Sequence, residues 1–327
     1  MISTPLVSVI IPCYNASKYV EKAVRSIMEQ TYPNLEILIA NDCSTDNTLE
    51  ILELLSKEDS RIKIINNEQN LKIVKTLNKL IEIATGKYIA RMDVDDISLP
   101  DRIEKQVLFL EKNPEYAMCG TNAWHIDDNG NIIGKTDLPL TPEKNKYFLK
   151  YYSTFYHPTI MIRSEVYKNN LYSEDYLYAE DYELWCRLIF KNDIKCANLK
   201  EKLFKYRISA SQTCNLHSND QSVVINKIFQ RYNIVSQRML VHHENIFIID
   251  GCYNKNEIYY VKELLGELDS EKLIYSYLPY TKVFLHIIKK YPKIKIFSFL
   301  LTKSFIKTFL YYIYKKICLR VSVLKAN

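Results

Sequence analysis

Residues 7–42 read VSVIIPCYNASKYVEKAVRSIMEQTYPNLEILIAND, and their pattern sets the architecture of the first half of the chain. Residues 7–12 are a short run rich in β-branched side chains, which is typical of a buried strand. Residues 17–29 then place apolar side chains at helical spacing, and residues 35–40 are a second apolar run of strand length. A strand, a helix and another strand in this order predict a unit with parallel strands.

The same alternation continues as far as residue 120. Further strands are predicted at residues 62–66, 87–92 and 116–120, and further helices at residues 46–56, 73–84 and 100–112. Together these segments predict an α/β fold with a doubly wound, mostly parallel sheet and helices on both faces. In such sheets, ligands bind beyond the carboxyl ends of the strands.

The pattern changes after residue 120. Residues 123–134, AWHIDDNGNIIG, predict a β-hairpin with Asn-Gly at its turn. Residues 157–167 predict a strand followed by a helix, and another helix is expected to begin near Glu180. From about residue 220 onward the pattern is helical, without strand alternation.

The charge of the chain is unevenly distributed. The formal net charge is +6, yet residues 280–327 contain eleven Lys or Arg and no Asp or Glu, so the first 279 residues carry about −5. We expect an α/β domain over residues 1–218 and a helical extension over residues 219–327 that ends in this basic segment. Because the first 279 residues are mildly acidic, nucleic-acid binding fits poorly.

The basic segment, residues 280–327, spaces its lysines among apolar and aromatic residues. This composition predicts an amphipathic helix that lies on an anionic membrane. A packed helical subdomain with a solvated basic face, or a homodimer interface, would explain the same pattern. The N-terminal residues lack a basic region and a cleavage site, and no run reaches the roughly 18 apolar residues of a membrane span. Eight scattered cysteines without a C-x-x-C pair favour a reducing compartment.

Polar side chains follow three of the predicted strands. They are Tyr14 and Asn15 after the first strand, Asp42 after the second, and Asp93, Asp95 and Asp96 after the fourth. Because parallel strands end at the same edge of a sheet, we expect these side chains to converge there. Three acids at a strand end are unfavourable unless a cation lies beside them.

A divalent metal ion is the cation that this acidic cluster suits. Two carboxylates one residue apart can ligate Mg²⁺ or Mn²⁺, which completes its shell with diphosphate oxygens and water. The tripeptide D-x-D is also common in solvated turns, so its position after a strand is what favours a metal. No G-x-G-x-x-G follows the first strand, and no phosphate-loop signature is present. A nucleotide diphosphate would therefore be held through the metal.

Four segments, in this order and spacing, resemble the family 2 glycosyltransferases with the GT-A fold. They are VSVIIPCYNASKYVEKAVRSIMEQTYPNLEILIANDCSTDNT, GKYIARMDVDDISLPDRIEKQ, YAEDYELWCRL and LFKYR, and the resemblance covers roughly residues 5–215. Within the family, the chain is most similar to bacterial enzymes of lipooligosaccharide and capsule synthesis, in particular β-1,3-N-acetylhexosaminyltransferases.

The resemblance implies a set of residues that bind the donor. Tyr14 would lie against the uracil ring, in a site that also includes Pro12 and Asn15. Asp42 would accept a hydrogen bond from the uracil N3–H, and Asp93 would lie beside the ribose.

The resemblance also implies residues for the chemical step. Asp95 would ligate the metal, with Asp96 adjacent to it. Asp181 would be the general base, with Glu180 beside it as a substrate-binding residue, and Arg207 would contact the diphosphate. From the residues alone, an acid favoured at a helix start by the helix dipole is the more common role of Asp181, and the resemblance reverses this preference.

The chain departs from the family pattern at three loop positions. Asn41 replaces an acid, and Cys43 and Lys72 stand where glycine is usual, which leaves the shape of these loops open. His157 and Trp185 are expected to be structural rather than catalytic.

The resulting prediction is an inverting, metal-dependent glycosyltransferase that moves a hexose or N-acetylhexosamine from a UDP-sugar. The acceptor would be a hydroxyl of a growing bacterial surface glycan, such as lipooligosaccharide, O-antigen or capsule, free or lipid-linked. The Q-x-x-R-W block of processive polymerases is absent, so one sugar per encounter is expected. The expected location is cytoplasmic, peripheral on the inner face of the cell membrane.

Two other functions stay open at this point. A sugar nucleotidyltransferase also uses a doubly wound sheet and metal-binding acids, but it would normally have a glycine-rich loop after the first strand. A non-catalytic glycan-assembly subunit is the other alternative, and the presence of both Asp95 and Asp181 argues against it.

Overall fold

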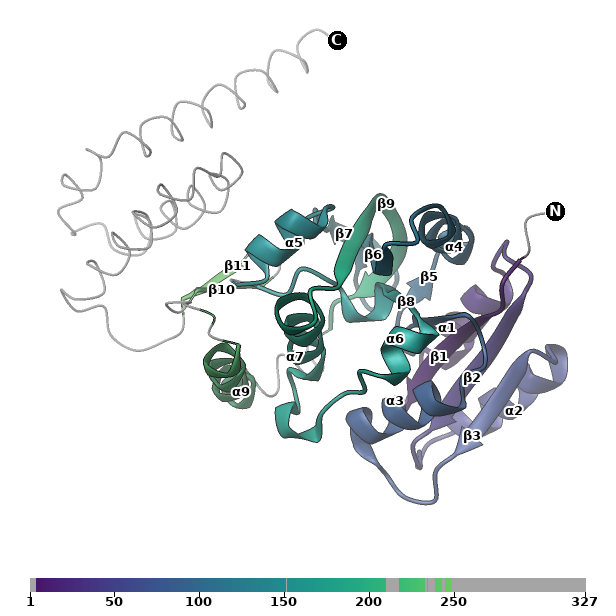
Figure 1. The fold of residues 1–327 in the computed structure, drawn as a ribbon. Helices are drawn as coiled ribbons and strands as arrows, with labels where there is room; N and C mark the ends of the chain where they lie inside the picture. Colours follow the sequence, from purple (N-terminus) through teal and green to yellow (C-terminus); the bar gives the residue numbers. More distant parts are fainter. Residues whose placement is uncertain are drawn as a thin grey trace, which may run out of the picture. The chain divides into compact units, whose positions relative to one another are not determined.

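The computed structural model describes residues 4–150, 152–209, 218–232, 234, 239–242 and 245–248 (Figure 1). The chain divides into two compact units, Met1–Val235 and Ser236–Asn327. The predicted basic segment, residues 280–327, lies outside the described residues. Among the helices that are described, none has the length and apolar character needed to cross a membrane.

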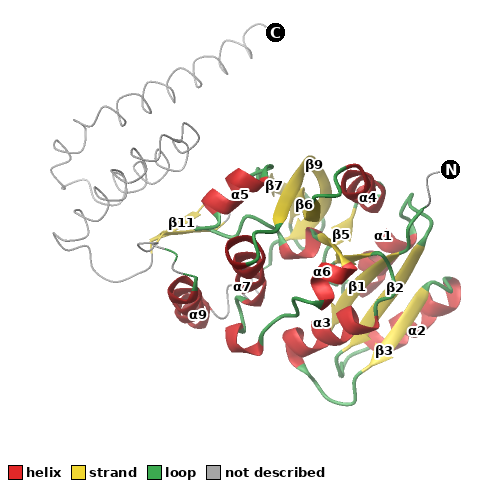
Figure 2. Ribbon diagram, in the orientation of Figure 1, coloured by secondary structure: helices red, strands yellow, loops and turns green. Residues whose placement is uncertain are grey.

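The first unit is built on one twisted sheet, shown in yellow in Figure 2. Its strands are β1 (Val7–Cys13), β2 (Leu35–Asn41), β3 (Ile62–Asn66), β4 (Tyr88–Arg91), β5 (Ile97–Ser98), β6 (Tyr116–Ile126), β7 (Ile132–Lys135), β8 (Met161–Arg163) and β9 (Lys195–Arg207). They lie in the order β3-β2-β1-β4-β8-β6-β9-β5, with β7 paired to β6. The first four strands in this order are parallel, and so are β6 and β9. The predicted mostly parallel sheet is confirmed.

Two features of the sheet differ from a simple alternating sheet. Strand β8 lies between β4 and β6 and is antiparallel to both. Strand β9 pairs with β6 along almost its whole length, although no strand was predicted at Lys195–Arg207. These pairings join segments far apart in the sequence, which local periodicity cannot report.

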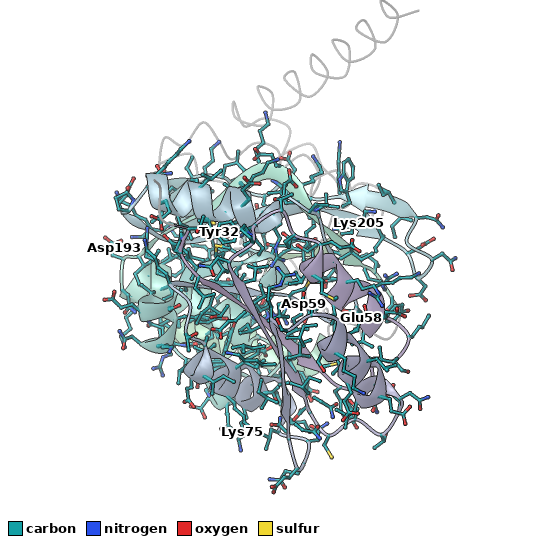
Figure 3. The ribbon with its side chains drawn as sticks, turned by 90° about the vertical axis from the view of Figure 1, so that its right-hand side faces the viewer. Tyr32, Glu58, Asp59, Lys75, Asp193 and Lys205 are labelled. Atoms are coloured by element: carbon teal, nitrogen blue, oxygen red, sulfur yellow. The ribbon has the colours of Figure 1, made fainter. Side chains whose placement is uncertain are left out.

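Helices cover both faces of the sheet, as predicted. They are α1 (Val20–Met28), α2 (Thr48–Glu58), α3 (Lys72–Ile83), α4 (Arg102–Lys112), α5 (Pro142–Phe148), α6 (Ser164–Lys168), α7 (Glu180–Cys186) and α9 (Ser218–Arg231). Helices α1, α2 and α4 pack on one face, and α3 and α6 lie on the other. Helix α2 ends at Glu58, which is labelled beside Asp59 in Figure 3.

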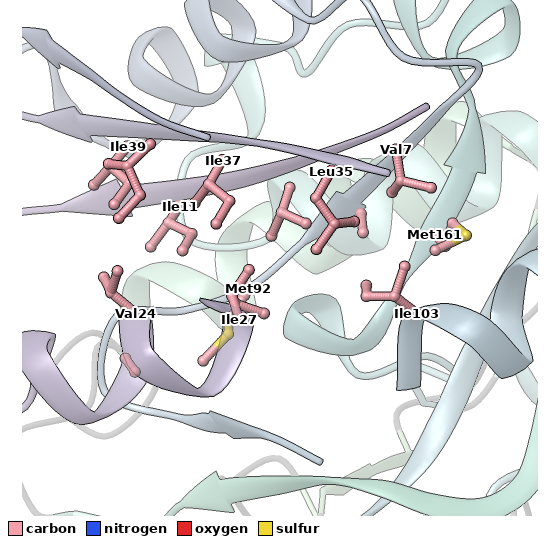
Figure 4. Packing of buried hydrophobic residues seen from close by; sticks show 14 of the residues in the cluster. Val7, Ile11, Val24, Ile27, Leu35, Ile37, Ile39, Met92, Ile103 and Met161 are labelled. Atoms are coloured by element: carbon pink, nitrogen blue, oxygen red, sulfur yellow. The ribbon is translucent and has the colours of Figure 1, made fainter. Parts of the chain in front are cut away.

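The core forms because β1 and β2 are buried on both faces. Every residue of both strands is buried, which explains why they read as continuous apolar runs rather than as alternating ones. Figure 4 shows Ile11, Ile37 and Ile39 of these strands facing Val24 and Ile27 of α1. Fully burying a side chain of this size contributes about 1.5–3 kcal/mol.

The second half of the first unit also contains the elements that its patterns predict. The β6–β7 hairpin turns at Asn129-Gly130, and Gly130 has a φ of 90°, a conformation that glycine adopts without strain. Strand β8 leads into α6, and α7 begins at Glu180.

The prediction of a helical pattern without strands after residue 220 is wrong in part. Helix α9 is present, but β10 (Met239–His242) and β11 (Asn245–Ile248) form an antiparallel pair. Two runs rich in strand-forming residues lie only two residues apart, which is the length of a tight hairpin. Each run is so short that it does not disturb the helical periodicity of the longer segment around it.

A buried carboxylate fixes the entry to β4. The Glu36 carboxylate accepts hydrogen bonds from the Ser8 hydroxyl (2.5 Å), from the Thr85 backbone N–H (2.7 Å) and hydroxyl (2.8 Å), and from Lys63 (3.1 Å). Burial alone would raise the pKa of Glu36, but these hydrogen bonds outweigh it and lower the pKa to about 2. The ionised form therefore stabilises the fold.

Replacing Glu36 by glutamine is expected to lower the free energy of unfolding at neutral pH by about 2 kcal/mol. Because the folded pKa lies below the ordinary 4.5, the contribution of Glu36 is fully present above that pH and is lost as the pH falls toward 2. Urea unfolding at pH 7 and pH 3.5 measures this difference. Glu36→Gln should reduce the difference in the free energy of unfolding between pH 7 and pH 3.5. The exposed control Glu53→Gln should leave this difference unchanged.

Candidate active site

The loops after β1 and β2 form the first part of the site. Pro12 pairs in register with Ala40, so the two strands end at the same level of the sheet. Tyr14 follows directly and is 49% exposed. The Asn15 side chain accepts a hydrogen bond from the Thr45 backbone N–H at 2.8 Å, which ties the two loops together. The exposed ring of Tyr14 thus lies at the strand ends on a fixed loop.

Asp42 is held in place by the start of α3. Its carboxylate accepts hydrogen bonds from the Asn67 side chain (2.8 Å) and from the backbone N–H groups of Leu71 (2.8 Å) and Lys72 (3.0 Å). Asp42 is only 4% exposed, so it is oriented before any ligand arrives. The sequence indicated Asp42 but gave no sign of these partners.

The two positions where glycine is usual in the family keep a left-handed backbone. Cys43 has a φ of 61° and Lys72 has a φ of 69°. A non-glycine residue pays on the order of 1 kcal/mol for this conformation. Both loops therefore keep the backbone conformation that glycine favours, although Cys43 and Lys72 stand in its place.

Three carboxylates gather after β4. Ligand oxygens of Asp93, Asp95 and Asp96 all lie within 4.8 Å of one another. Asp93 is engaged at both oxygens by Arg91, at 2.6 and 2.5 Å. Asp96 is 1% exposed and accepts a hydrogen bond from the Arg207 backbone N–H at 2.7 Å. Among the described residues, no other side chain pairs with the carboxylate of Asp95.

The electrostatics of this cluster fit a bound divalent ion. Burial, and then the charge of Asp93, raise the pKa of Asp95 to about 6, and the pKa of Asp96 is raised well above its usual value for the same reasons. Such shifts mean that ionised carboxylates repel one another here. Oxygen ligands of this kind suit Mg²⁺ or Mn²⁺, and no described side chain forms a hydrogen bond with the carboxylate of Asp95.

Arg91 is a residue of the site that the sequence analysis missed. Its side chain is 3% exposed, it lies at the end of β4, and it forms the bidentate pair with Asp93. The sequence raised the question of which cation lies beside the acids, and the structure shows that one of them belongs to the chain itself. The signal was a single arginine at the end of an otherwise apolar strand.

Asp181 and Glu180 begin α7 and face the same region. Burial raises the pKa of Asp181, while Arg91 lowers it and Asp93 raises it, so both groups are close enough to act on Asp181. Glu180 is 8% exposed, and burial followed by the charge of Asp181 raises its pKa to about 7. Asp181 also accepts a hydrogen bond from the Tyr182 backbone N–H at 2.7 Å, as an acid at a helix start can.

Arg207 braces the acidic loop. Its Nε donates to the backbone oxygen of Asp95 at 2.8 Å, and its Nη1 donates to that of Asp127 at 2.6 Å. Because Arg207 is only 3% exposed, these contacts hold the acidic loop against the β6–β7 hairpin. A contact with a diphosphate stays a prediction.

Trp185 is a core residue, and His157 is half-buried beside it. The Nε2 atom of His157 lies 2.6 Å from the Tyr172 hydroxyl, and burial lowers the pKa of His157 well below its usual value. Trp185 is fully buried, with the rings of Phe155 and His157 at 5.7 and 6.0 Å.

Solved structures with a similar fold are glycosyltransferases. A fragment of Staphylococcus aureus TarS in complex with UDP-GlcNAc matches with a TM-score of 0.56 at 21% identity, over 68% of this chain and 65% of that one. The mannosyltransferase PcManGT from Pyrobaculum calidifontis, in complex with GDP-Man and Mn²⁺, matches with a TM-score of 0.54 at 16% identity, over 72% and 66%. At these identities the likeness concerns the fold, and it is the GT-A fold of glycosyltransferases.

The sequence relatives point the same way. A Haemophilus influenzae protein described as an uncharacterized glycosyltransferase is 41% identical over 245 residues, which is 72% of this chain and 75% of the relative. The Escherichia coli protein WfgD, described as a UDP-Glc:alpha-D-GlcNAc-diphosphoundecaprenol beta-1,3-glucosyltransferase, is 34% identical over 63% of this chain and 78% of its own. The profile described as Glycosyl transferase family 2 matches residues 8–171. The chain belongs to glycosyl transferase family 2 and is a glycosyltransferase.

Proposed function

We propose that the chain transfers a hexose or N-acetylhexosamine from a UDP-sugar to a hydroxyl of a growing bacterial surface glycan. The observation that carries the proposal is the free carboxylate of Asp95 at the strand ends, with Asp181 close to the same acidic cluster. The name of WfgD, with a UDP-sugar donor and a diphosphoundecaprenol acceptor, supports this choice of substrates. The lipooligosaccharide, O-antigen or capsule nature of the acceptor belongs to the same proposal.

The donor would bind along the ends of β1, β2 and β4. Tyr14 offers an exposed ring for the uracil, and Pro12 and Asn15 shape the loop around it. Asp42, already oriented by α3, accepts from the uracil N3–H. Asp93, neutralised by Arg91, lies beside the ribose.

Asp95 would hold the Mn²⁺ or Mg²⁺ ion. The ion supplies positive charge that stabilises the leaving diphosphate. Arg207 keeps the Asp95 backbone in place, and we propose that it also contributes to binding the diphosphate.

Asp181 would remove the proton of the attacking acceptor hydroxyl. Burial raises the pKa of Asp181, which makes its carboxylate a stronger base than an ordinary aspartate. Direct attack assisted by one base inverts the anomeric configuration, so an α-linked donor gives a β-glycoside. Glu180, buried beside Asp181, would bind the sugar.

A panel of UDP-sugars, scored by UDP release with Mn²⁺ and with a chelator, tests the proposal. Release of UDP with one donor, and its loss on chelation, is the expected result. Pyrophosphate in place of UDP would identify a sugar nucleotidyltransferase. The absence of any release with every donor and a lipid-linked acceptor would favour a non-catalytic assembly subunit.

Replacing Tyr14 by alanine is expected to raise the KM for the UDP-sugar about tenfold, because stacking of a base on an aromatic ring contributes about 1–3 kcal/mol. Steady-state kinetics at saturating acceptor measure the change. Tyr14→Phe keeps the ring and should retain the wild-type KM. An unchanged KM in Tyr14→Ala would mean that the base does not lie on this ring.

The division of the chain into a transferase domain over residues 1–218 and an extension over residues 219–327 is also a proposal. Here the extension would hold the cytoplasmic enzyme on the inner face of the membrane through residues 280–327. Deleting these residues is expected to release the protein from membranes and leave UDP-sugar binding intact, as sedimentation and calorimetry would show. Loss of folding would support a packed subdomain instead, and loss of a dimer would support a homodimer interface.

A further inference from the structure

The β6–β7–β9 part of the sheet carries a tryptophan surrounded by lysines. Trp124 of β6 pairs in register with Lys135 of β7 on one side and with Lys205 of β9 on the other. Residues paired in this way project from the same face of a sheet. The Lys202 ammonium lies 5.1 Å from the centre of the Trp124 ring. Lys205 of β9 is labelled in Figure 3.

On this face Lys135 is exposed, and Trp124, Lys202 and Lys205 are half-buried. The residues next to Trp124 and Lys205, Ala123 and Phe204, belong to the buried core cluster, and successive strand residues face opposite sides. Ile133, two residues from Lys135, lies at the irregularity in the pairing of β7 with β6 and is 58% exposed. We name Trp124, Ile133, Lys135, Lys202 and Lys205 the lysine–tryptophan face.

The charges of the lysine–tryptophan face are not neutralised by the protein. Within the described part of the chain, none of its three lysines forms an ion pair, whereas Lys87 and Lys146 elsewhere pair with acids at 2.6 and 2.7 Å. Ile132, at the tip of the same hairpin, is 55% exposed beside Ile133. Unpaired lysines around a tryptophan and exposed isoleucines match the composition of a surface that rests at a lipid–water interface.

We propose that the lysine–tryptophan face docks on an anionic lipid surface. The charge selects the partner, because the lysines complement phosphate-bearing headgroups while Trp124 and Ile133 enter the interfacial layer. This surface is separate from residues 280–327. The docking proposal rests on the proposed function only because docking would give the enzyme access to a lipid-linked acceptor. Contact with lipid can be measured without turnover.

Docking here would hold the active site close to the lipid. The turn of the β6–β7 hairpin accepts a hydrogen bond from Arg207 through the Asp127 backbone oxygen, and Arg207 also bonds the Asp95 backbone. Tyr19, at the start of α1, donates to Asp128 of the same turn at 3.0 Å. The hairpin is thus joined to the acidic loop through one side chain.

The two tryptophans of the chain make a direct test possible. Trp185 is fully buried, so lipid-borne quenchers can reach only Trp124. The full chain is mixed with vesicles of phosphatidylglycerol and phosphatidylethanolamine whose acyl chains carry bromine, and tryptophan emission is recorded. We expect quenching, its loss in Trp124→Phe, and no quenching with phosphatidylcholine alone.

Lysine variants test the charge. Lys202→Gln and Lys205→Gln should each raise the lipid concentration at half-maximal quenching by about fivefold. Lys57→Gln, an exposed lysine on α2, should not change it. Sedimentation of the chain with vesicles while Trp124 stays unquenched would overturn the proposal, and so would equal quenching by neutral lipid. If the chain self-associates without lipid and Trp124 is thereby shielded from quenchers, the lysine–tryptophan face would be assigned to contact with a second copy of the chain. A failed UDP-sugar panel would leave these readouts unaffected.

Discussion

Replacing Asp181 by asparagine is expected to reduce kcat by about 10³-fold while leaving the binding of the UDP-sugar unchanged. General base catalysis by a positioned carboxylate contributes about 10²–10⁴-fold, and asparagine keeps the shape of the side chain but cannot accept the proton. Calorimetry with UDP and Mn²⁺ measures binding, and UDP release in the presence of acceptor measures turnover. A loss confined to turnover is the signature of a base.

The pH dependence gives a second readout of Asp181. Burial raises its pKa, and only the deprotonated form accepts a proton, so kcat should fall with acid at a higher pH than an ordinary aspartate would give. Asp175→Asn is the matched control, because Asp175 is an exposed acid in the segment just before α7. If Asp181→Asn turned over normally, or if it lost donor binding as well, the base would have to be sought elsewhere.

Replacing Asp95 by asparagine is expected to lower kcat/KM by at least about 10²-fold and to abolish the Mn²⁺-dependent part of UDP binding. The reason is that Asp93 is engaged by Arg91, and Asp96 is buried with one oxygen held by the Arg207 backbone, so Asp95 is the carboxylate that we propose binds the metal. Manganese electron paramagnetic resonance with and without UDP measures the loss directly. Excess Mn²⁺ should restore part of the binding if the site keeps its shape.

Two variants separate metal binding from general damage. Asp101→Asn removes a half-exposed acid that pairs with Lys105 at the start of α4 and should behave as wild type. Asp96→Asn should lower thermal stability, because this buried side chain connects the acidic loop to β9. Full Mn²⁺-dependent UDP binding in Asp95→Asn would show that the proposed ligand is wrong.

The elements that local pattern predicts well are those with a continuous buried stripe. Strands β1 to β4 and helices α1 to α4 lie within about three residues of their predicted bounds, because a buried strand or helix face imposes a regular apolar pattern. The Asn-Gly turn and the start of α7 at Glu180 are also confirmed. Strand β9 was missed because its exposed lysines interrupt the apolar pattern, and the β10–β11 pair was missed because each strand has only four residues.

The sequence by itself determined the parallel sheet, the family and the edge where Asp42 and the three acids converge. The sheet and this edge follow from periodicity and from residues placed directly after strands, and the family follows from the resemblance of the four quoted segments. Only the tertiary structure decided which acid is free. Arg91 reaches Asp93 from β4, and Arg207 reaches Asp96 across 111 residues of sequence, whereas no side chain among the described residues pairs with the carboxylate of Asp95. Contacts between distant segments decide which carboxylate has a partner, and a local sequence pattern does not contain this information.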